Sequence, residues 1–137
     1  MTRALVLDAE AFTVLARGRG RRFDEVRAAL EAARRLRRDV VVPAVVLAEL
    51  NRAPKYNALV DACLSRDSAI EVRDTDRALA RLVGGVLAAA RAGSADLADA
   101  HNVAVAVEAG GGVILTGDRL DLERLAGPYP HVQVAAI

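Results

Sequence analysis

The chain alternates short apolar runs with longer segments in which apolar residues recur at helical spacing. An uninterrupted apolar run is typical of a strand covered on both faces, whereas a helical repeat predicts an amphipathic helix. The runs predict strands at residues 4–7, 40–42, 70–72, 113–115 and 132–135. The segments between them predict helices at residues 10–16, 23–36, 43–50, 57–64, 76–92, 94–108 and 121–125.

Local signals mark the ends of several of these helices. Pro43 suits the first position of a helix, because its ring fixes φ and the missing N–H is not needed there. Thr75 and Ser94 precede two further helices, and their hydroxyls can cap them. The glycine run 110–112 closes the second of these helices.

Strands separated by helices predict a mainly parallel central sheet flanked by helices on both faces, a three-layer α/β/α fold. The length of 137 residues suits a single domain, over residues 1–137. Right-handed crossovers bring the carboxyl ends of parallel strands to one edge of the sheet. The ligand crevice of such a fold lies just beyond that edge.

Composition narrows the range of functions. Hydrophobic residues make up 53% of the chain and aromatic residues only 3%, so small aliphatic side chains must build the core. The net charge of +1 means that any contact with nucleic acid depends on local basic patches. The N-terminal apolar run is too short for a signal peptide or a membrane span, so we expect a soluble, cytoplasmic protein. The single Cys63, on an apolar stripe, is expected to be buried and inert.

Acidic residues fall at the predicted crevice from distant parts of the chain. Asp8 ends the first strand, and Asp118 follows the fourth strand by a short turn. Glu49 is a lone charge in an apolar helix that starts at the same edge. Asp99 lies on the helix that leads into the fourth strand, and Asp96, three residues earlier, shares its face. We expect these carboxylates to converge.

Carboxylates gathered in one crevice repel one another unless a cation compensates them. Oxygen ligands without Cys or His suit Mg²⁺, or Mn²⁺, and we expect His101 to be a surface or second-shell residue rather than a ligand. Two such ions about 4 Å apart can activate a water and stabilise the leaving oxygen of a phosphodiester. The acids therefore predict a metal-dependent hydrolase.

Each acid also has a plainer interpretation. Asp8 can simply cap the helix that follows it, and Asp118 can be a turn residue. Glu49 can form an ion pair with Arg52, which would offset the cost of its apolar surroundings. Asp96 can be a first-turn residue that is favoured by the helix dipole.

The order and spacing of these acids resemble the PIN-domain ribonucleases and, within them, the VapC-type toxins of bacterial toxin–antitoxin pairs. The resemblance extends from Val6-Leu7-Asp8 to Asp118-Arg119-Leu120. It assigns the catalytic and metal-binding acids to Asp8, Glu49, Asp99 and Asp118, with Thr116 in the second shell. It implies Mg²⁺- or Mn²⁺-dependent cleavage of structured RNA, usually tRNA or rRNA. It also implies a homodimer and inhibition by a small cognate antitoxin.

Two positions depart from the family pattern. Glu10 stands where the family often has Ser, Thr or Asn to help hold metal-bound water, so this extra acid either adds a ligand or weakens phosphate approach. Asp96 is also additional, and it is a possible further ligand beside Asp99 or a contact for the substrate.

Arginines crowd two segments. A glycine-spaced group follows the first helix and is the candidate RNA-binding loop, with a plain solvated loop as the alternative: Arg17, Arg19, Arg21 and Arg22. The second group ends the next helix, where the helix dipole alone explains basic residues: Arg34, Arg35, Arg37 and Arg38. The scarcity of aromatic residues argues for recognition of backbone and shape.

Two other functions compete with this interpretation of the sequence. A phosphatase of the haloacid-dehalogenase type also has an acid after its first strand, but it needs a second Asp and a Thr nearby, and this chain reads Asp8-Ala9-Glu10-Ala11-Phe12. Its only lysine, Lys55, falls too early for the usual partner position. A catalytically inactive PIN fold that binds RNA is the second rival, and the presence of all four acids argues against it.

Overall fold

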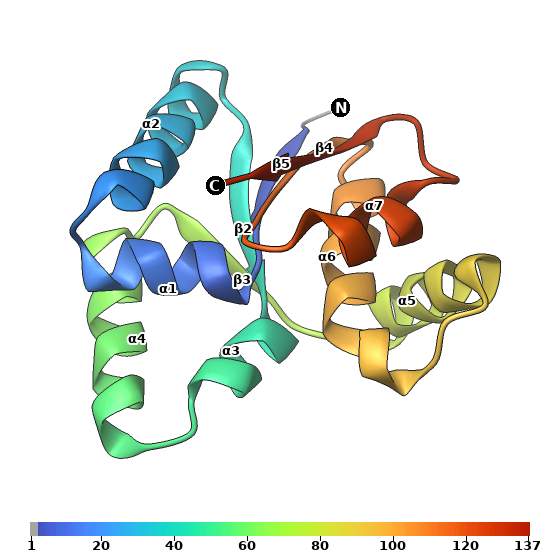
Figure 1. The fold of residues 1–137 in the computed structure, drawn as a ribbon, viewed down its shortest axis with the longest axis horizontal. Helices are drawn as coiled ribbons and strands as arrows, with labels where there is room; N and C mark the ends of the chain where they lie inside the picture. Colours follow the sequence, from blue (N-terminus) through green and yellow to red (C-terminus); the bar gives the residue numbers. More distant parts are fainter. Residues whose placement is uncertain (1–2) are drawn as a thin grey trace.

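A single parallel sheet of five strands forms the centre of the molecule. The computed structural model describes residues 3–137 and orders the strands β3-β2-β1-β4-β5 (Figure 1). All four strand pairings are parallel. The strands are β1 (Ala4–Leu7), β2 (Asp39–Pro43), β3 (Ile70–Arg73), β4 (Gly112–Thr116) and β5 (Val132–Ala136).

Helices cover both faces of this sheet. One core joins the sheet to α5, α6 and α7, and a second core joins its other face to α1, α2, α3 and α4. The helices are α1 (Ala9–Arg17), α2 (Arg21–Arg35), α3 (Ala44–Leu50), α4 (Pro54–Arg66), α5 (Arg77–Ala90), α6 (Leu97–Glu108) and α7 (Arg119–Ala126), and a short 3₁₀ turn, η1 (Ser94–Asp96), precedes α6. The three-layer α/β/α prediction is confirmed.

The middle of the sheet is built from the small aliphatic residues that the composition led us to expect. All four residues of β1 are buried, as are Val40, Val41 and Val42 in β2. Gly112 begins β4 and faces Ala4 so closely that a β-carbon there would collide with the carbonyl of Ala4. This glycine lets β4 lie against β1, which places the ends of both strands at one edge.

Three of the predicted helix starts were wrong. Asp76, not Thr75, caps α5: its Oδ1 accepts the N–H of Leu79 at 2.8 Å. Ser94 begins the 3₁₀ turn, and α6 starts at Leu97 without a side-chain cap. Pro43 ends β2 in extended conformation, so α3 begins one residue later.

The remaining helices and strands match their predicted positions within a few residues at each end. Within residues 3–137, no helix is both long enough and apolar enough to cross a membrane. Cys63 is fully buried, and burial raises the pKa of its thiol, as an inert core cysteine requires.

Candidate metal centre

Asp8 is a helix cap, which is the plainer of its two interpretations, and its role as a metal ligand stays a prediction. It follows β1 directly and caps α1, because its Oδ1 accepts the N–H of Ala11 at 2.8 Å. The residue is only 8% exposed, and burial raises the pKa of its carboxyl although the Ala11 hydrogen bond opposes the shift. The cap therefore fixes one carboxylate oxygen at the carboxyl edge of the sheet.

Asp99 shows that the acids converge. Burial raises the pKa of its carboxyl to about 6, and the next largest causes are the charges of four other acids. These acids come from the β1–α1 junction, α7, α3 and η1: Asp8, Asp121, Glu49 and Asp96. Since the charge of each acts on the Asp99 carboxyl, the five acids lie around the carboxyl edge of the sheet, and the space among them is called the crevice here.

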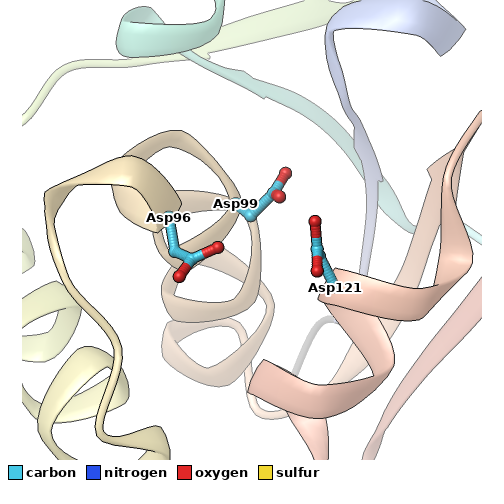
Figure 2. A group of neighbouring side chains, drawn as sticks. All are labelled: Asp96, Asp99 and Asp121. Atoms are coloured by element: carbon cyan, nitrogen blue, oxygen red, sulfur yellow. The ribbon is translucent and has the colours of Figure 1, made fainter.

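Three of these carboxylates are within reach of a single ion. One oxygen from each of Asp96, Asp99 and Asp121 lies within 4.8 Å of the other two. Figure 2 shows the three side chains turned toward a common space between α6 and α7. Arg124 from α7 contacts Asp96 at 3.0 Å, so Asp96 already has one positive partner.

Asp118 lies differently. Its side chain caps α7 and accepts the N–H of Leu120 at 3.2 Å, and the residue is exposed. Thr116 is buried, and its hydroxyl both donates to the carbonyl of Asp118 and accepts the N–H of Asp118, each at 2.9 Å. Thr116 therefore fixes the turn that carries Asp118, while the Asp118 carboxylate stays at the helix cap.

Two glutamates border the crevice from other elements. Glu49 is exposed on α3, and within residues 3–137 it makes no ion pair with Arg52. Glu10 is paired with Arg22 at 2.6 Å. The Glu10 carboxylate also lies against Gly117, so that any side chain at position 117 would have to displace it. Glu10 thus reaches the turn that carries Asp118 while Arg22 compensates its charge.

The glycine-spaced loop keeps most of its arginines exposed. Arg17, Arg19 and Arg21 make no ion pair in the part of the chain that the structure describes, whereas Arg22 is taken up by Glu10. Gly18 has a φ of 72°, the left-handed conformation that ends α1 and that a glycine adopts without strain. Arg17 and Arg22 line one hollow together with Glu10, next to the acids.

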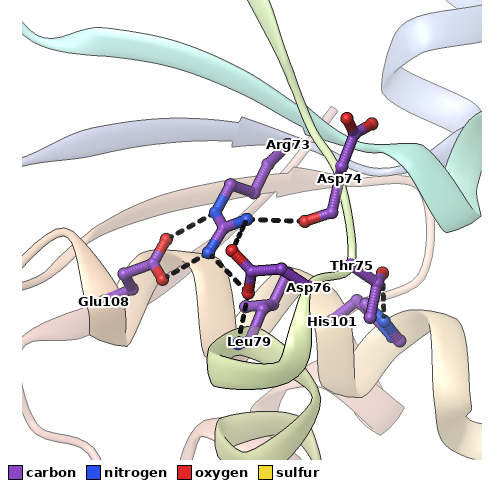
Figure 3. Close-up of polar contacts among 7 residues, drawn as sticks. All are labelled: Arg73, Asp74, Thr75, Asp76, Leu79, His101 and Glu108. Atoms are coloured by element: carbon purple, nitrogen blue, oxygen red, sulfur yellow. Dashed lines mark hydrogen bonds and ion pairs between the residues drawn. The ribbon is translucent and has the colours of Figure 1, made fainter.

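His101 was predicted to be a surface or second-shell residue, and the structure shows that it is not at the surface. It is 4% exposed, its Nδ1 lies 2.7 Å from the carbonyl of Leu97, and its Nε2 lies 2.9 Å from the Thr75 hydroxyl (Figure 3). Both ring nitrogens therefore have protein partners. The hydroxyl of Thr75 is used here, which explains why Asp76 caps α5.

The donor set of the crevice fits a hard divalent cation. It consists of carboxylate oxygens, which is the ligand type that Mg²⁺ and Mn²⁺ prefer, and no thiol or free imidazole competes among residues 3–137. One turn after Asp99 on α6, Asn102 is 1% exposed, and its Oδ1 has no hydrogen-bond partner. A buried carbonyl oxygen without a donor favours a site that takes up further ligands or water.

Asp121 is the residue that the sequence analysis missed. The sequence predicted a helix that begins at Asp121, but α7 begins at Arg119 and turns Asp121 toward Asp99. The available signal was its spacing, since Asp121 follows Asp118 by three residues and so lies near it on one helix face. An acid pair at that spacing also marked Asp96 and Asp99.

The molecule thus combines an α/β/α fold with a group of carboxylates at the carboxyl edge of its sheet. The chain belongs to the PIN domain family, whose model matches residues 5–128. PIN domains are nuclease domains and generally use divalent metal ions. No functionally curated protein matches the sequence.

Solved structures share the fold at low sequence identity. The chain is similar to VapBC2 from Rickettsia felis bound to a promoter DNA fragment, at 17% identity and a TM-score of 0.67 over 98% of each chain. A DNA-bound VapBC from Salmonella typhimurium gives 17% identity and a TM-score of 0.67, over 99% of this chain and 98% of that one. A toxin–antitoxin complex from Klebsiella pneumoniae gives 17% identity and a TM-score of 0.64, over 93% of this chain and 94% of that one.

Proposed function

We propose that this PIN domain is a metal-dependent endoribonuclease that acts in the cytoplasm as the toxin of a toxin–antitoxin pair. The observation that carries the proposal is geometric: one carboxylate oxygen from each of Asp96, Asp99 and Asp121 lies within 4.8 Å of the other two. Burial and the charges of neighbouring acids, which raise the pKa of Asp99 to about 6, agree with it. Such a group of acids is costly to the folded protein by itself. A cation that binds there removes the cost and makes the crevice attractive to a phosphate.

The proposed ligands are the acids that the sequence singled out, together with one that the fold adds. Asp8, Glu49, Asp99 and Asp118 carry over from the sequence analysis, and Asp121 joins them because of its distance to Asp99. Asp96 assists from the rim, where Arg124 holds it. Mg²⁺ or Mn²⁺, when bound, polarises the phosphate and makes a water more acidic.

The protein's own contribution is to keep these groups in place. The Ala11 N–H holds the Asp8 carboxylate in one orientation, and Thr116 holds the turn that carries Asp118. Glu10 is proposed as a second-shell group rather than a ligand, because Arg22 neutralises it. The PIN membership and these contacts support a site that is ordered before substrate arrives.

We propose structured RNA, such as tRNA or rRNA, as the substrate. Arg17, Arg19 and Arg21 are exposed at the junction of α1 and α2 and are proposed to contact phosphates, with Arg22 shared between Glu10 and the substrate. Since aromatic residues make up only 3% of the chain, recognition by base stacking is not expected.

A small antitoxin protein is proposed as the partner, and the active form is proposed to be a homodimer. The support is the fold, because the similar solved structures are VapBC and other toxin–antitoxin complexes. A neighbouring short reading frame whose product copurifies with the chain would identify this partner.

The direct test is cleavage of total RNA by purified, inhibitor-free protein, with Mn²⁺ or with EDTA, followed by mapping of fragment ends. Asp8→Asn keeps the helix cap, because Asn caps as well as Asp, but removes the charge. We expect it to lose activity by about 100- to 1,000-fold. Asp76→Asn is the matched control, because Asp76 also caps a helix at 2.8 Å but lies outside the crevice, and it should cut like the parent.

The rival functions give different outcomes. A folded parent that cuts no RNA with Mn²⁺, yet hydrolyses p-nitrophenyl phosphate, would favour the phosphatase. An Asp8→Asn variant that binds RNA and inhibits growth as the parent does would favour a non-catalytic binding module.

A further inference from the structure

A second charged cleft lies at the opposite edge of the sheet from the acids. It has a volume of about 540 Å³ and is formed by the end of α2, the start of β2 and the connection from α4 to β3. Figure 1 shows the turn from α2 into β2, which belongs to this region, at the opposite end of β2 from α3. Five arginines line it: Arg27, Arg34, Arg37, Arg38 and Arg66.

The acids that line the cleft do not neutralise these arginines. Asp67 is largely buried and is shared by Arg27 at 2.6 Å and Arg66 at 3.4 Å. Glu31 reaches only Arg34, at 4.0 Å. Asp39, the third acid of the lining, is exposed and forms no ion pair within residues 3–137, so three acids face five arginines. Arg37 and Arg38 make no ion pair within residues 3–137, so their guanidinium donors are open to an anion.

The backbone holds these two arginines at fixed positions. The N–H of Arg37 donates to Arg34 and the N–H of Arg38 donates to Ala33, the hydrogen bonds that close a helix end. Arg37 itself is left-handed, with a φ of 54°, where glycine or asparagine is preferred. Arg91 ends α5 with the same hydrogen bonds and a φ of 52°, so this conformation alone does not mark a site. What distinguishes Arg37 is that it lines the cleft.

We infer that this arginine cleft, defined by the five arginines above, binds phosphates of an RNA backbone at a point distant from the acids. The cleft contains no aromatic residue on which a base could stack, so phosphate rather than nucleobase is the group it suits. The inference rests on the proposed function, because the RNA that reaches the cleft is taken to be the substrate.

The dimensions favour a polymer over a mononucleotide. The strands that separate the two edges are four or five residues long, which corresponds to roughly 15 Å. A ligand held at both edges must therefore span several nucleotides. The cleft would add affinity for long RNA without touching the bond that is cut.

The test uses the Asp8→Asn protein, which keeps RNA intact, and measures RNA binding by fluorescence anisotropy at several salt concentrations. The double variant Arg37→Asn/Arg38→Gln removes both unpaired charges. Asn is chosen at position 37 because it accepts the left-handed backbone conformation. We expect affinity for folded tRNA to fall by about 10-fold and the salt dependence to lose about two phosphate contacts. Arg91→Asn with Arg35→Gln is the matched control, because both are exposed arginines at helix ends outside the cleft, and it should leave both quantities unchanged.

Equal losses in both double variants would overturn the inference, and so would no loss in either, because then only general charge or no charge at all matters. A second measurement addresses free anions: inorganic phosphate should raise the melting temperature of the parent more than that of Arg37→Asn/Arg38→Gln, because the variant lacks two of the cleft's cations. A rise that only the parent shows, together with unchanged RNA binding, would assign the cleft to a small anion instead.

Failure of this inference is separable from failure of the proposed function. In the otherwise unmodified chain, Arg37→Asn/Arg38→Gln should slow cleavage of a long RNA but not of a short fragment around the cut site. Absence of any cleavage by the parent would count against the nuclease, whereas the anisotropy result would still decide on the arginine cleft.

Discussion

Two groups of acidic side chains in this molecule have opposite electrostatic surroundings. In the first, the guanidinium of Arg73 contacts Glu108 at 2.8 and 2.9 Å and Asp76 at 3.1 Å (Figure 3). The hydrogen bond from Leu79, followed by that from Arg73, lowers the pKa of Asp76, and Arg73 lowers the pKa of Glu108. In the second, burial and neighbouring acids raise the pKa of Asp99 to about 6.

The difference separates a structural use of charge from a functional one. The Arg73 network joins the end of β3, the start of α5 and the end of α6, and its charges are balanced within the chain. Arg124 pairs with Asp96 at the rim of the crevice, but in the part of the chain that the structure describes no basic side chain forms an ion pair with Asp99. A group of acids left unbalanced by the protein has to be balanced from solution, and this is the expected design of a metal site.

Of the two acids at the start of α7, Asp121 is expected to show the larger effect, which tests whether proximity to Asp99 decides the ligand set. We expect Asp121→Asn to reduce RNA cleavage by about 100-fold, and Asp118→Asn, whose side chain lies at a helix cap, by about 10-fold. Initial rates at saturating Mn²⁺ measure both. A larger loss for Asp118→Asn would mean that the turn rearranges when the ion binds.

Removing Arg73 should damage the fold rather than the reaction. Arg73→Ala leaves Glu108 and Asp76 without their shared partner, and we expect a loss of about 1–2 kcal/mol, or roughly 4 °C in melting temperature. Urea unfolding measures the stability of the variant, and the cleavage rate at 20 °C measures its activity. If cleavage fell while stability stayed constant, the assignment of this network to structure would be wrong.

The smallest expected effect concerns Asp99, whose negative charge destabilises the metal-free protein, whereas Arg73 stabilises it. Because the pKa of Asp99 in the folded protein lies above the ordinary value of 3.8, the folded state keeps a proton that the unfolded state has already released as pH rises from about 4 to 6. The metal-free protein should therefore lose stability over this range, by about 1 kcal/mol after allowance for solvent screening.

Asp99→Asn should abolish this pH dependence and melt higher than the parent at pH 7.5 in EDTA. Glu108→Gln should melt at a lower temperature than the parent, because the substitution removes the carboxylate that pairs with Arg73. Differential scanning calorimetry from pH 4 to 8 distinguishes the two. A parent whose stability rises between pH 4 and 6 as much as that of Asp99→Asn would contradict the raised pKa.

Much of the architecture could be predicted because it follows from local pattern. A run such as Ala4–Leu7 is apolar throughout, and only a strand in the middle of a covered sheet buries all four residues. The position of Asp8 after that strand then follows from chain direction alone. The parallel order of the strands, in turn, brings Asp8 and the β4–α7 turn to the same edge.

The errors arose where tertiary contacts choose between equivalent local options. Thr75 and Asp76 are both good caps, and the choice depends on His101, which is 26 residues away and takes the Thr75 hydroxyl. Asp118 and Asp121 are both acids near a helix start, and the packing of Leu122 and Leu125 into the core sets which of them faces α6. Their spacing in the sequence marks Asp118 and Asp121 as a pair but does not tell which of the two faces α6.

The central claim is that the acids around Asp99 hold a divalent cation because Asp8, Asp99 and Asp121 form no ion pair within residues 3–137. Mn²⁺ titration followed by electron paramagnetic resonance counts free and bound ions directly. The account predicts binding of one or two Mn²⁺ by the parent, at least about 10-fold weaker binding by Asp99→Asn, and parent-like binding by Glu108→Gln. A folded parent that binds no Mn²⁺, or binding that Asp99→Asn leaves unchanged, would contradict it.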